Sequence, residues 1–210
     1  MKYAIVPVTP FQQNCTVLWC EDTMRGVVVD PGGDLDRVLA AVDGSGAAIE
    51  RVLLTHGHID HAGGARELAD RLGVRIEGPH RADQFLLDQM PQQGALFGLP
   101  PLPPVETDRW LDAGDTVNVG AQVLDVLHCP GHTPGHVVFL HRPSRLALVG
   151  DVVFRGSVGR TDLPGGSHDV LMKSIAEHLL PLDDETRILP GHGPMSTIGV
   201  ERRTNPYLAR

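Results

Sequence analysis

The sequence is poor in cysteine, and the cysteines that it has do not form a pattern. Only 3 of its 210 residues are cysteine, which is an odd number. Cys15 and Cys20 lie at an odd spacing in a strand-like segment, so they point to opposite faces and do not predict a disulfide. A fold that depends on a framework of disulfide bonds is therefore excluded.

Long apolar runs and basic clusters are absent as well. No stretch approaches the length of about 18 apolar residues that marks a membrane span, and the apolar run at the N-terminus is too short for a signal peptide. The formal net charge is -8, and the longest basic run is the pair Arg202-Arg203, which gives a polyanion no surface to bind. We therefore expect no nucleic-acid partner, no membrane partner and a cytoplasmic location.

The remaining composition is typical of a globular protein. Hydrophobic residues make up 41% of the chain and charged residues 21%, without a low-complexity tract. A chain of 210 residues can bury most of its apolar surface in one core. We predict a single domain that covers residues 1–210.

Short apolar runs bounded by turn residues alternate with segments of helical spacing. The strands predicted in the first half, around a helix at 61–72, are at 4–8, 15–20, 26–29, 51–54 and 74–77. Those predicted in the second half, around a helix at 168–179, are at 116–119, 122–127, 137–140, 146–149 and 187–189. Two β-rich halves that end in helices predict two sheets packed face to face with helices outside, an αββα sandwich of the α+β class. Between them, the proline-rich segment 91–104 is predicted to be a surface loop that could flank a site.

Metal-ligand residues are concentrated in the segment 56–61, which reads His-Gly-His-Ile-Asp-His between an apolar strand and a helix. His56 and His58 are two positions apart and project to one face of an extended segment. Asp60 and His61 turn into the helix and can face a neighbouring point. One short motif can therefore serve two metal ions.

Three later predicted strands are also followed by a ligand-type side chain, namely His132, Asp151 and His192. Histidine and carboxylate ligands without cysteine suit zinc, iron or manganese. Seven ligand positions are too many for one tetrahedral zinc, but they fit two ions that share a carboxylate, which we assign to Asp151. The histidines interpreted as structural are His80, His128, His141, His168 and His178.

In kind and in order, these residues resemble the metallo-β-lactamase superfamily pattern: an H-x-H-x-D-H segment, a later histidine, a bridging aspartate and a final histidine. Segments 130–136 and 190–194 look most like glyoxalase II (hydroxyacylglutathione hydrolase), especially its short bacterial type that lacks the C-terminal helical domain. The resemblance implies a four-layer αββα sandwich. It also implies metal ligands for one ion at His56, His58 and His132, for the other at Asp60, His61 and His192, and for both at Asp151.

The function implied by this resemblance is a binuclear metal-dependent hydrolase that cleaves a glutathione thioester such as a 2-hydroxyacylglutathione. Two divalent ions per chain, with zinc as first choice and iron or manganese as alternatives, would lower the pKa of a shared water toward about 7. Asp60 is then the predicted catalytic residue, because it can orient the resulting nucleophile. Arg160 is the predicted contact for an anionic substrate. The expected partner is a small-molecule thioester, and the oligomeric state stays open.

Two alternatives remain. The persulfide dioxygenase branch, which uses mononuclear iron, resembles the chain at 159–162 but tends to carry Cys where His136 stands. A non-catalytic metal-binding module would keep the fold without turnover. Other branches fit less well. The flavodiiron pattern needs Glu in place of His58, secreted β-lactamases use a Cys ligand and a signal peptide, and lactonase relatives use a site tyrosine, whereas Tyr3 and Tyr207 stand near the chain ends.

Overall fold

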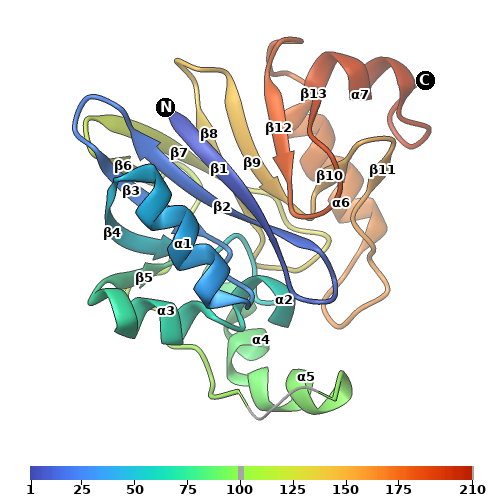
Figure 1. Cartoon of the computed structure of the whole chain (residues 1–210). Coiled ribbons are helices and arrows are strands. Elements are labelled where there is room, and N and C mark those ends of the chain that lie inside the picture. The colour runs from blue at the N-terminus through green and yellow to red at the C-terminus, as the bar shows by residue number, and fades with distance from the viewer. Residues whose placement is uncertain (99–101, 210) are drawn as a thin grey trace.

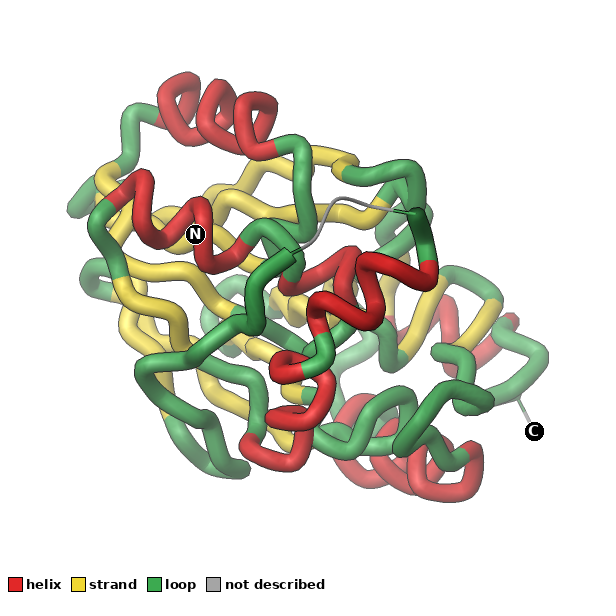
Figure 2. The backbone as a smooth tube through the Cα atoms, turned by 90° about the horizontal axis from the view of Figure 1, so that it is seen from below, coloured by secondary structure: helices red, strands yellow, loops and turns green. Residues whose placement is uncertain are grey.

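Two β-sheets packed face to face form the centre of the molecule, and helices cover both outer faces (Figure 1). The structure is a computed structural model that describes residues 1–98 and 102–209. Seen from below, the strands occupy the middle and the helices lie outside them (Figure 2). The predicted four-layer αββα sandwich is confirmed.

The first sheet has five strands in the order β1-β2-β3-β4-β5, which is also their order in the chain. β1, β2 and β3 are antiparallel neighbours, whereas β4 and β5 run parallel to β3 and require helical crossovers. The strands are β1 (Lys2–Val8), β2 (Gln13–Cys20), β3 (Arg25–Val29), β4 (Ala48–Leu53) and β5 (Arg75–Glu77). The crossover helices are α1 (Leu35–Ser45), α2 (Ile59–Ala62) and α3 (Ala65–Leu72).

The second sheet has six strands in the order β13-β12-β9-β8-β7-β6. They are β6 (Thr116–Val119), β7 (Gln122–His128), β8 (Val137–His141), β9 (Leu146–Gly150), β12 (Arg187–Pro190) and β13 (Ser196–Thr197). Its outer face carries α6 (His168–Ser174), which continues as a π turn (Ile175–Leu179), and α7 (Ile198–Thr204). A separate hairpin of β10 (Val153–Phe154) and β11 (Ser157–Val158) follows β9.

Alternation along the strands fills three apolar layers. In β2, Leu18 packs between the sheets with Phe139 of β8, while its neighbour Val17 packs outward with Val38 of α1. On the far side, buried residues of β8 and β9 pack against Leu171 and the π turn. The two sheets are therefore apolar on both faces, which leaves polar side chains to gather at the strand ends.

The helix predicted at 61–72 is two helices, α2 and α3, with Gly63 and Gly64 between them. A Cβ on Gly63 would lie 2.5 Å from the carbonyl oxygen of Ile59, and one on Gly64 would lie 2.6 Å from that of Pro31. The turn after β3 packs so closely on this point that no side chain fits, and the chain bends there.

The loop predicted at 91–104 is wrong in its first half, because α5 (Met90–Leu96) occupies it. Pro91 stands in the first turn of α5, where its missing N–H has no helical partner to lose. A 3-10 turn (Arg81–Asp83) and α4 (Gln84–Asp88) precede α5. The middle of the predicted loop, 99–101, lies outside the described residues. Within the part of the chain that is described, no helix combines the length and the apolarity that crossing a membrane requires.

Candidate metal centre

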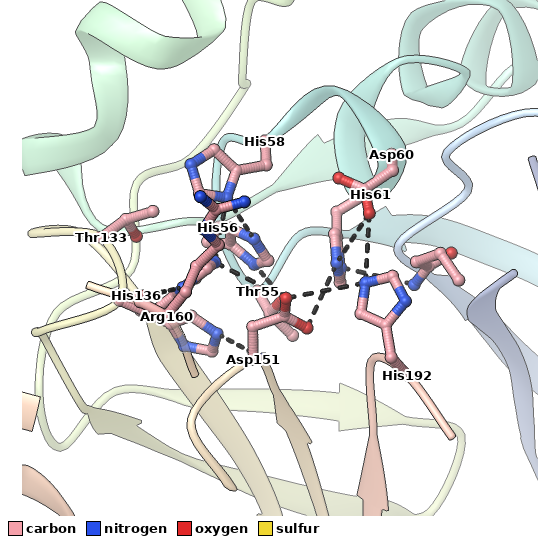
Figure 3. Close-up of polar contacts among 12 residues, drawn as sticks. Thr55, His56, His58, Asp60, His61, Thr133, His136, Asp151, Arg160 and His192 are labelled. Atoms are coloured by element: carbon pink, nitrogen blue, oxygen red, sulfur yellow. Dashed lines mark hydrogen bonds and ion pairs between the residues drawn. The ribbon is translucent and has the colours of Figure 1, made fainter. Parts of the chain in front are cut away.

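The seven predicted ligand residues lie together, although they come from four separate places in the chain (Figure 3). Each place is the end of a strand or the loop that follows it. The segment 56–61 follows β4, His132 follows β7, Asp151 follows β9 and His192 follows β12. The fold therefore brings the ligand-type side chains that follow these strands to one place.

His56, His58 and His132 form a three-histidine group. The Nδ1 atom of His58 lies 3.1 Å from Nε2 of His56 and 2.9 Å from Nε2 of His132. The three nitrogen atoms thus converge on one point, as the ligands of a single metal ion do.

Asp60, His61 and His192 form a mixed group. The Nε2 atom of His192 lies 3.1 Å from Oδ2 of Asp60, and the same oxygen lies 3.7 Å from Nε2 of His61. This second set of converging atoms is also suited to one ion, and it contains the carboxylate that the first set lacks.

Asp151 lies between the two groups. Its Oδ1 atom is 3.3 Å from Nε2 of His61, and its Oδ2 atom is 3.6 Å from Nε2 of both His132 and His192. One carboxylate therefore faces members of both groups, which is the position that a bridging ligand between two ions requires.

Hydrogen bonds on the outer side of the rings fix which nitrogen faces the centre. The Nδ1 atom of His61 donates to Oδ2 of Asp30 at 2.9 Å, and Nδ1 of His132 donates to the carbonyl oxygen of Arg160 at 2.7 Å. The Nδ1 atom of His192 donates to the carbonyl oxygen of Phe11 at 3.2 Å. In each ring the other nitrogen, Nε2, therefore faces the centre and can bind a metal once it carries no proton, which is the usual arrangement of metal-bound histidine.

Among the predicted ligands, all of which the structure describes, the buried atoms Nε2 of His61 and Oδ1 of Asp151 lie 3.3 Å apart and have no hydrogen-bond partner within the described residues. Unpaired buried polar atoms are costly, and a cation between a ring nitrogen and a carboxylate oxygen would satisfy both. Gly191 leaves them room, because a Cβ there would lie 2.2 Å from that Asp151 oxygen. The residues present therefore fit a metal centre, and nitrogen with carboxylate oxygen suits zinc, iron or manganese.

The three-histidine group is held neutral. Burial lowers the pKa of His58 to about 3, and the neighbouring His132 adds to the shift. Burial also lowers the pKa of His132 and takes that of His56 well below its usual value. Neutral imidazole is the form that binds metal, so this group can bind a cation without losing a proton.

The mixed group is charged instead. Burial favours neutral His61, but the carboxylates of Asp151 and Asp60 outweigh it and raise the pKa of His61 well above its usual value. Burial is outweighed in the same way at Asp151, because His61 holds the pKa of that carboxyl well below its usual range. A cation bound here would replace the proton of His61, so binding releases a proton from this group.

Asp30 is a further residue of the centre that was not among the predicted ligands. It lies beside His56 and His61, but its oxygens are already occupied. Oδ1 accepts from the backbone N–H of Thr55 at 2.7 Å, and Oδ2 accepts from the Thr55 hydroxyl at 2.6 Å and from His61. Asp30 therefore orients His61 and does not itself point to a third ion. Its position directly after β3 was the signal, since the other site residues also follow strands.

His136 supports the centre from below. Its Nε2 atom accepts from the backbone N–H of Asp151 at 3.0 Å, and its ring stacks on His56 with 4.7 Å between the ring centroids. His136 is fully buried. It thus fixes the backbone of one predicted ligand and the ring of another. In the sequence, His136 marked only a difference from the persulfide dioxygenase branch.

Asp83 connects the two loops that carry the three-histidine group. Its carboxylate accepts from the backbone N–H of Gly57 at 2.9 Å, from the Thr133 hydroxyl at 2.7 Å and from the backbone N–H of Gly135 at 2.5 Å. Burial raises the pKa of Asp83 to about 6. No signal in the sequence marks this residue, because it lies in a segment of ordinary helical spacing.

Arg160, the predicted substrate contact, lines the cavity over the centre, but its guanidinium is engaged. It donates two hydrogen bonds of 2.7 Å to the carboxylate of Asp162, and both side chains are exposed. Arg160 contacts the centre through its backbone carbonyl oxygen, which accepts the hydrogen bond from His132.

The fold and the centre define the class of protein. The sequence pattern of the "Metallo-beta-lactamase superfamily" matches residues 8–192, and the chain belongs to this superfamily. Its members bind divalent metal ions, typically two.

One curated relative and two solved structures are similar to the chain over nearly its whole length. The chain is 42% identical to "Hydroxyacylglutathione hydrolase GloC" of Haemophilus influenzae over 99% of this chain and 98% of that one. Among solved structures, "BLEG-1 B3 metallo-beta-lactamase" superposes with a TM-score of 0.92 at 33% identity, covering 100% of both chains. "TTHA1623 in a di-iron-bound form" superposes with a TM-score of 0.88 at 38% identity, covering 98% of this chain and 100% of that one.

Proposed function

We propose that the protein is a binuclear metal-dependent hydrolase that cleaves a glutathione thioester such as a 2-hydroxyacylglutathione. The observation that carries the proposal is the position of Asp151 between two converging ligand groups. The similarity to a hydroxyacylglutathione hydrolase over almost the full length of both chains supports the choice of substrate.

In this proposal the three-histidine group holds one ion, the mixed group holds the other, and Asp151 serves both. When bound, such a pair of cations lowers the pKa of water toward about 7 and polarises a carbonyl oxygen, which is the chemistry that thioester hydrolysis needs. Zinc is the first choice for both positions. Iron is supported by the di-iron form of a relative, and manganese suits the same donor atoms.

Asp60 is the proposed catalytic residue. Its side chain is part-exposed at the cavity floor, and His61 and His192 together outweigh burial and lower the pKa of its carboxyl. Asp60 therefore stays an anion, which can accept a hydrogen bond from attacking water and orient it. The leaving group is a thiolate, and the pKa of a cysteine-like thiol is about 8.5. The thiolate can therefore leave without a strong acid nearby.

Arg160 is the proposed contact for an anionic part of the substrate, from the wall of the cavity. To bind the substrate, its guanidinium would have to break or share the ion pair with Asp162. An exposed ion pair of this kind is weak, so a substrate anion can replace the Asp162 carboxylate.

A persulfide dioxygenase that uses one iron is the second candidate. The ligands themselves would serve either reaction, and the resemblance at 159–162 favours testing it. The relative described as a B3 metallo-beta-lactamase makes β-lactams a third class of substrate to measure. A metal-binding module without turnover would show none of these activities.

The test compares zinc-loaded and iron-loaded protein on the three substrate classes. Thioester cleavage is followed under argon with 2-hydroxypropanoyl glutathione, oxygen uptake is followed with glutathione persulfide, and hydrolysis is followed with a panel of β-lactams. We expect thioester cleavage by both forms and little oxygen uptake. Oxygen uptake confined to the iron form, without thioester cleavage by either form, would overturn the proposal in favour of the dioxygenase.

A further inference from the structure

We infer that the preferred substrate carries an apolar group of about the size of a phenyl ring next to the scissile thioester bond. This inference rests on the proposed function and concerns the same site. It comes from the cavity above the metal centre and not from the ligands.

The cavity has a volume of 690 Å³ and opens over His58, Asp60 and Asp151. Typical small-molecule sites have volumes of about 300–1,000 Å³, so the space exceeds what a lactate-sized acyl group fills. The apolar side chains that line it include Phe11, Ile59, Leu96, Phe97, Phe154 and Leu163.

Aromatic rings stand on two sides of this cavity. Phe11 in the β1–β2 turn and Phe97 after α5 meet edge to face, with 5.0 Å between their ring centroids. Figure 1 shows that turn and α5 at the same end of the molecule. Phe154 of β10 lies near the centre itself, with its ring centroid 6.2 Å from that of His192. A ring bound between these walls would gain aromatic contacts directly beside the reacting atoms.

Three apolar side chains of the cavity lining are exposed to solvent. Phe11 is 38% exposed, Phe97 50% and Leu96 80%, and all three line the cavity. Large apolar side chains that gather at the mouth of a pocket indicate a ligand with matching apolar surface. We call these three side chains the rim.

Charge in the cavity points the same way. Among the lining residues that the structure describes, the cation besides the histidines of the centre is Arg160, and it is paired with Asp162. Gln93 is also occupied, because its side chain donates to the carbonyl oxygens of Gly57 and Leu86. Arg160 can therefore meet one carboxylate of a peptide thiol. Most of the remaining wall away from the metal centre is apolar, with Gln89, Gln92 and Ser157 as its other polar side chains.

Selectivity of this origin has a predictable size. One methylene group in an apolar pocket changes kcat/KM by about 10-fold to 200-fold, and a ring adds several carbon atoms. The rim stays partly exposed to water, so the preference should lie near the lower end of this range. We expect kcat/KM to be about tenfold or more higher for the ring-bearing substrate.

The experiment varies each side of the thioester separately in zinc-loaded protein. In one series glutathione is constant and the acyl group is 2-hydroxypropanoyl or 2-hydroxy-2-phenylacetyl. In the other the acetyl group is constant and the thiol is ethanethiol or 2-phenylethanethiol. The first series tests an apolar group on the acyl side, and the second tests one on the thiol side.

Each series is repeated with Phe97→Ala, Phe97→Leu and Phe11→Ala, and with Val123→Ala as matched control. Val123 of β7 is an exposed apolar residue, 46% accessible, that lies outside the cavity lining. Thermal melting of every variant checks that it is folded. Phe97→Leu keeps an apolar contact without the ring, so it separates loss of the ring from loss of bulk.

A preference of tenfold or more in either series, lowered by Phe97→Ala or Phe11→Ala and unchanged in Val123→Ala, is the expected result. Equal kcat/KM for small and ring-bearing thioesters in both series would overturn this inference while leaving thioester hydrolysis in place. A preference that neither rim substitution alters would also overturn it. Failure to cleave any thioester would overturn the proposed function as well.

Discussion

The metal centre at the floor of the cavity and the rim at its mouth are built on different principles. At the floor, His56 and His61 are fully buried, and hydrogen bonds with the Thr55 hydroxyl and the Asp30 carboxylate fix their rings. At the rim, Phe11 and Phe97 are part-exposed and pack edge to face against each other. Buried, hydrogen-bonded side chains such as those of the floor determine the chemistry, whereas part-exposed apolar side chains such as those of the rim determine which substrate binds.

The largest effect is expected from Asp151→Ala, because this substitution removes the carboxylate that faces both the three-histidine group and the mixed group. Activity should fall by more than about 100-fold, since even outer partners of metal ligands typically contribute 10-fold to 100-fold. Elemental analysis after gel filtration should show that both ions are lost more readily than in His61→Ala. Equal loss in the two variants would mean that Asp151 does not serve both ions.

Asp30→Asn tests whether the floor depends on its outer hydrogen bonds. The amide would place an NH2 group against His61 or Thr55, both of which donate to Asp30. Zinc affinity should fall by about 10-fold to 100-fold. Asp34→Asn, an exposed carboxylate near the same turn that accepts from Thr9, is the control and should leave affinity unchanged. An Asp30→Asn protein with normal zinc affinity would contradict this role.

Asp83 gives a pH test of the same floor. Burial raises its folded pKa to about 6, above the value of about 3.9 in an unfolded chain. Between these values the folded state holds more protons than the unfolded state, so stability falls as pH rises from about 4 to 6. The slope from this one group is at most about 1.4 kcal/mol per pH unit.

The comparison protein is Asp83→Asn, which cannot titrate at this position. Urea unfolding of the metal-free proteins at several pH values measures both curves, and titrations elsewhere in the chain are common to the two. We expect the difference in unfolding free energy to favour wild type less as pH rises through this window. Parallel curves would show that burial does not raise the pKa of Asp83.

The smallest effect is expected at the wall of the cavity, from Arg160→Gln. The guanidinium is exposed and paired with Asp162, while the backbone carbonyl that holds His132 remains in the variant. We expect KM to rise about threefold without a change in kcat, as for a contact made equally in ground and transition states. Arg142→Gln, at an exposed arginine paired with Asp125, is the control. A tenfold loss of kcat would place the guanidinium at the reacting atoms.

The floor could be read from the sequence because its chemistry is local. Ligand-type side chains follow apolar strands, and the ends of packed strands meet, so His132, Asp151 and His192 could be placed beside the segment 56–61 before any coordinates were known. Asp30 obeys the same rule and was missed because a following proline and glycine pair marked it as a turn.

The rim could not be read in this way. Phe11, Phe97 and Phe154 come from a turn, the end of a helix and a short hairpin, and no motif or spacing connects them. The prediction of a loop over 91–104 placed a segment beside the site but not the helix within it. Asp83 is similar, since its importance comes from backbone N–H groups that only the folded chain brings to it.

Titration of metal-free protein with zinc, with bound metal and thioester cleavage measured on the same samples, tests the two-ion floor most directly. If Asp151 is shared between two ions, bound zinc should saturate at two per chain and activity should reach its maximum only as the second ion binds. Saturation at one ion per chain with full thioester cleavage would contradict it.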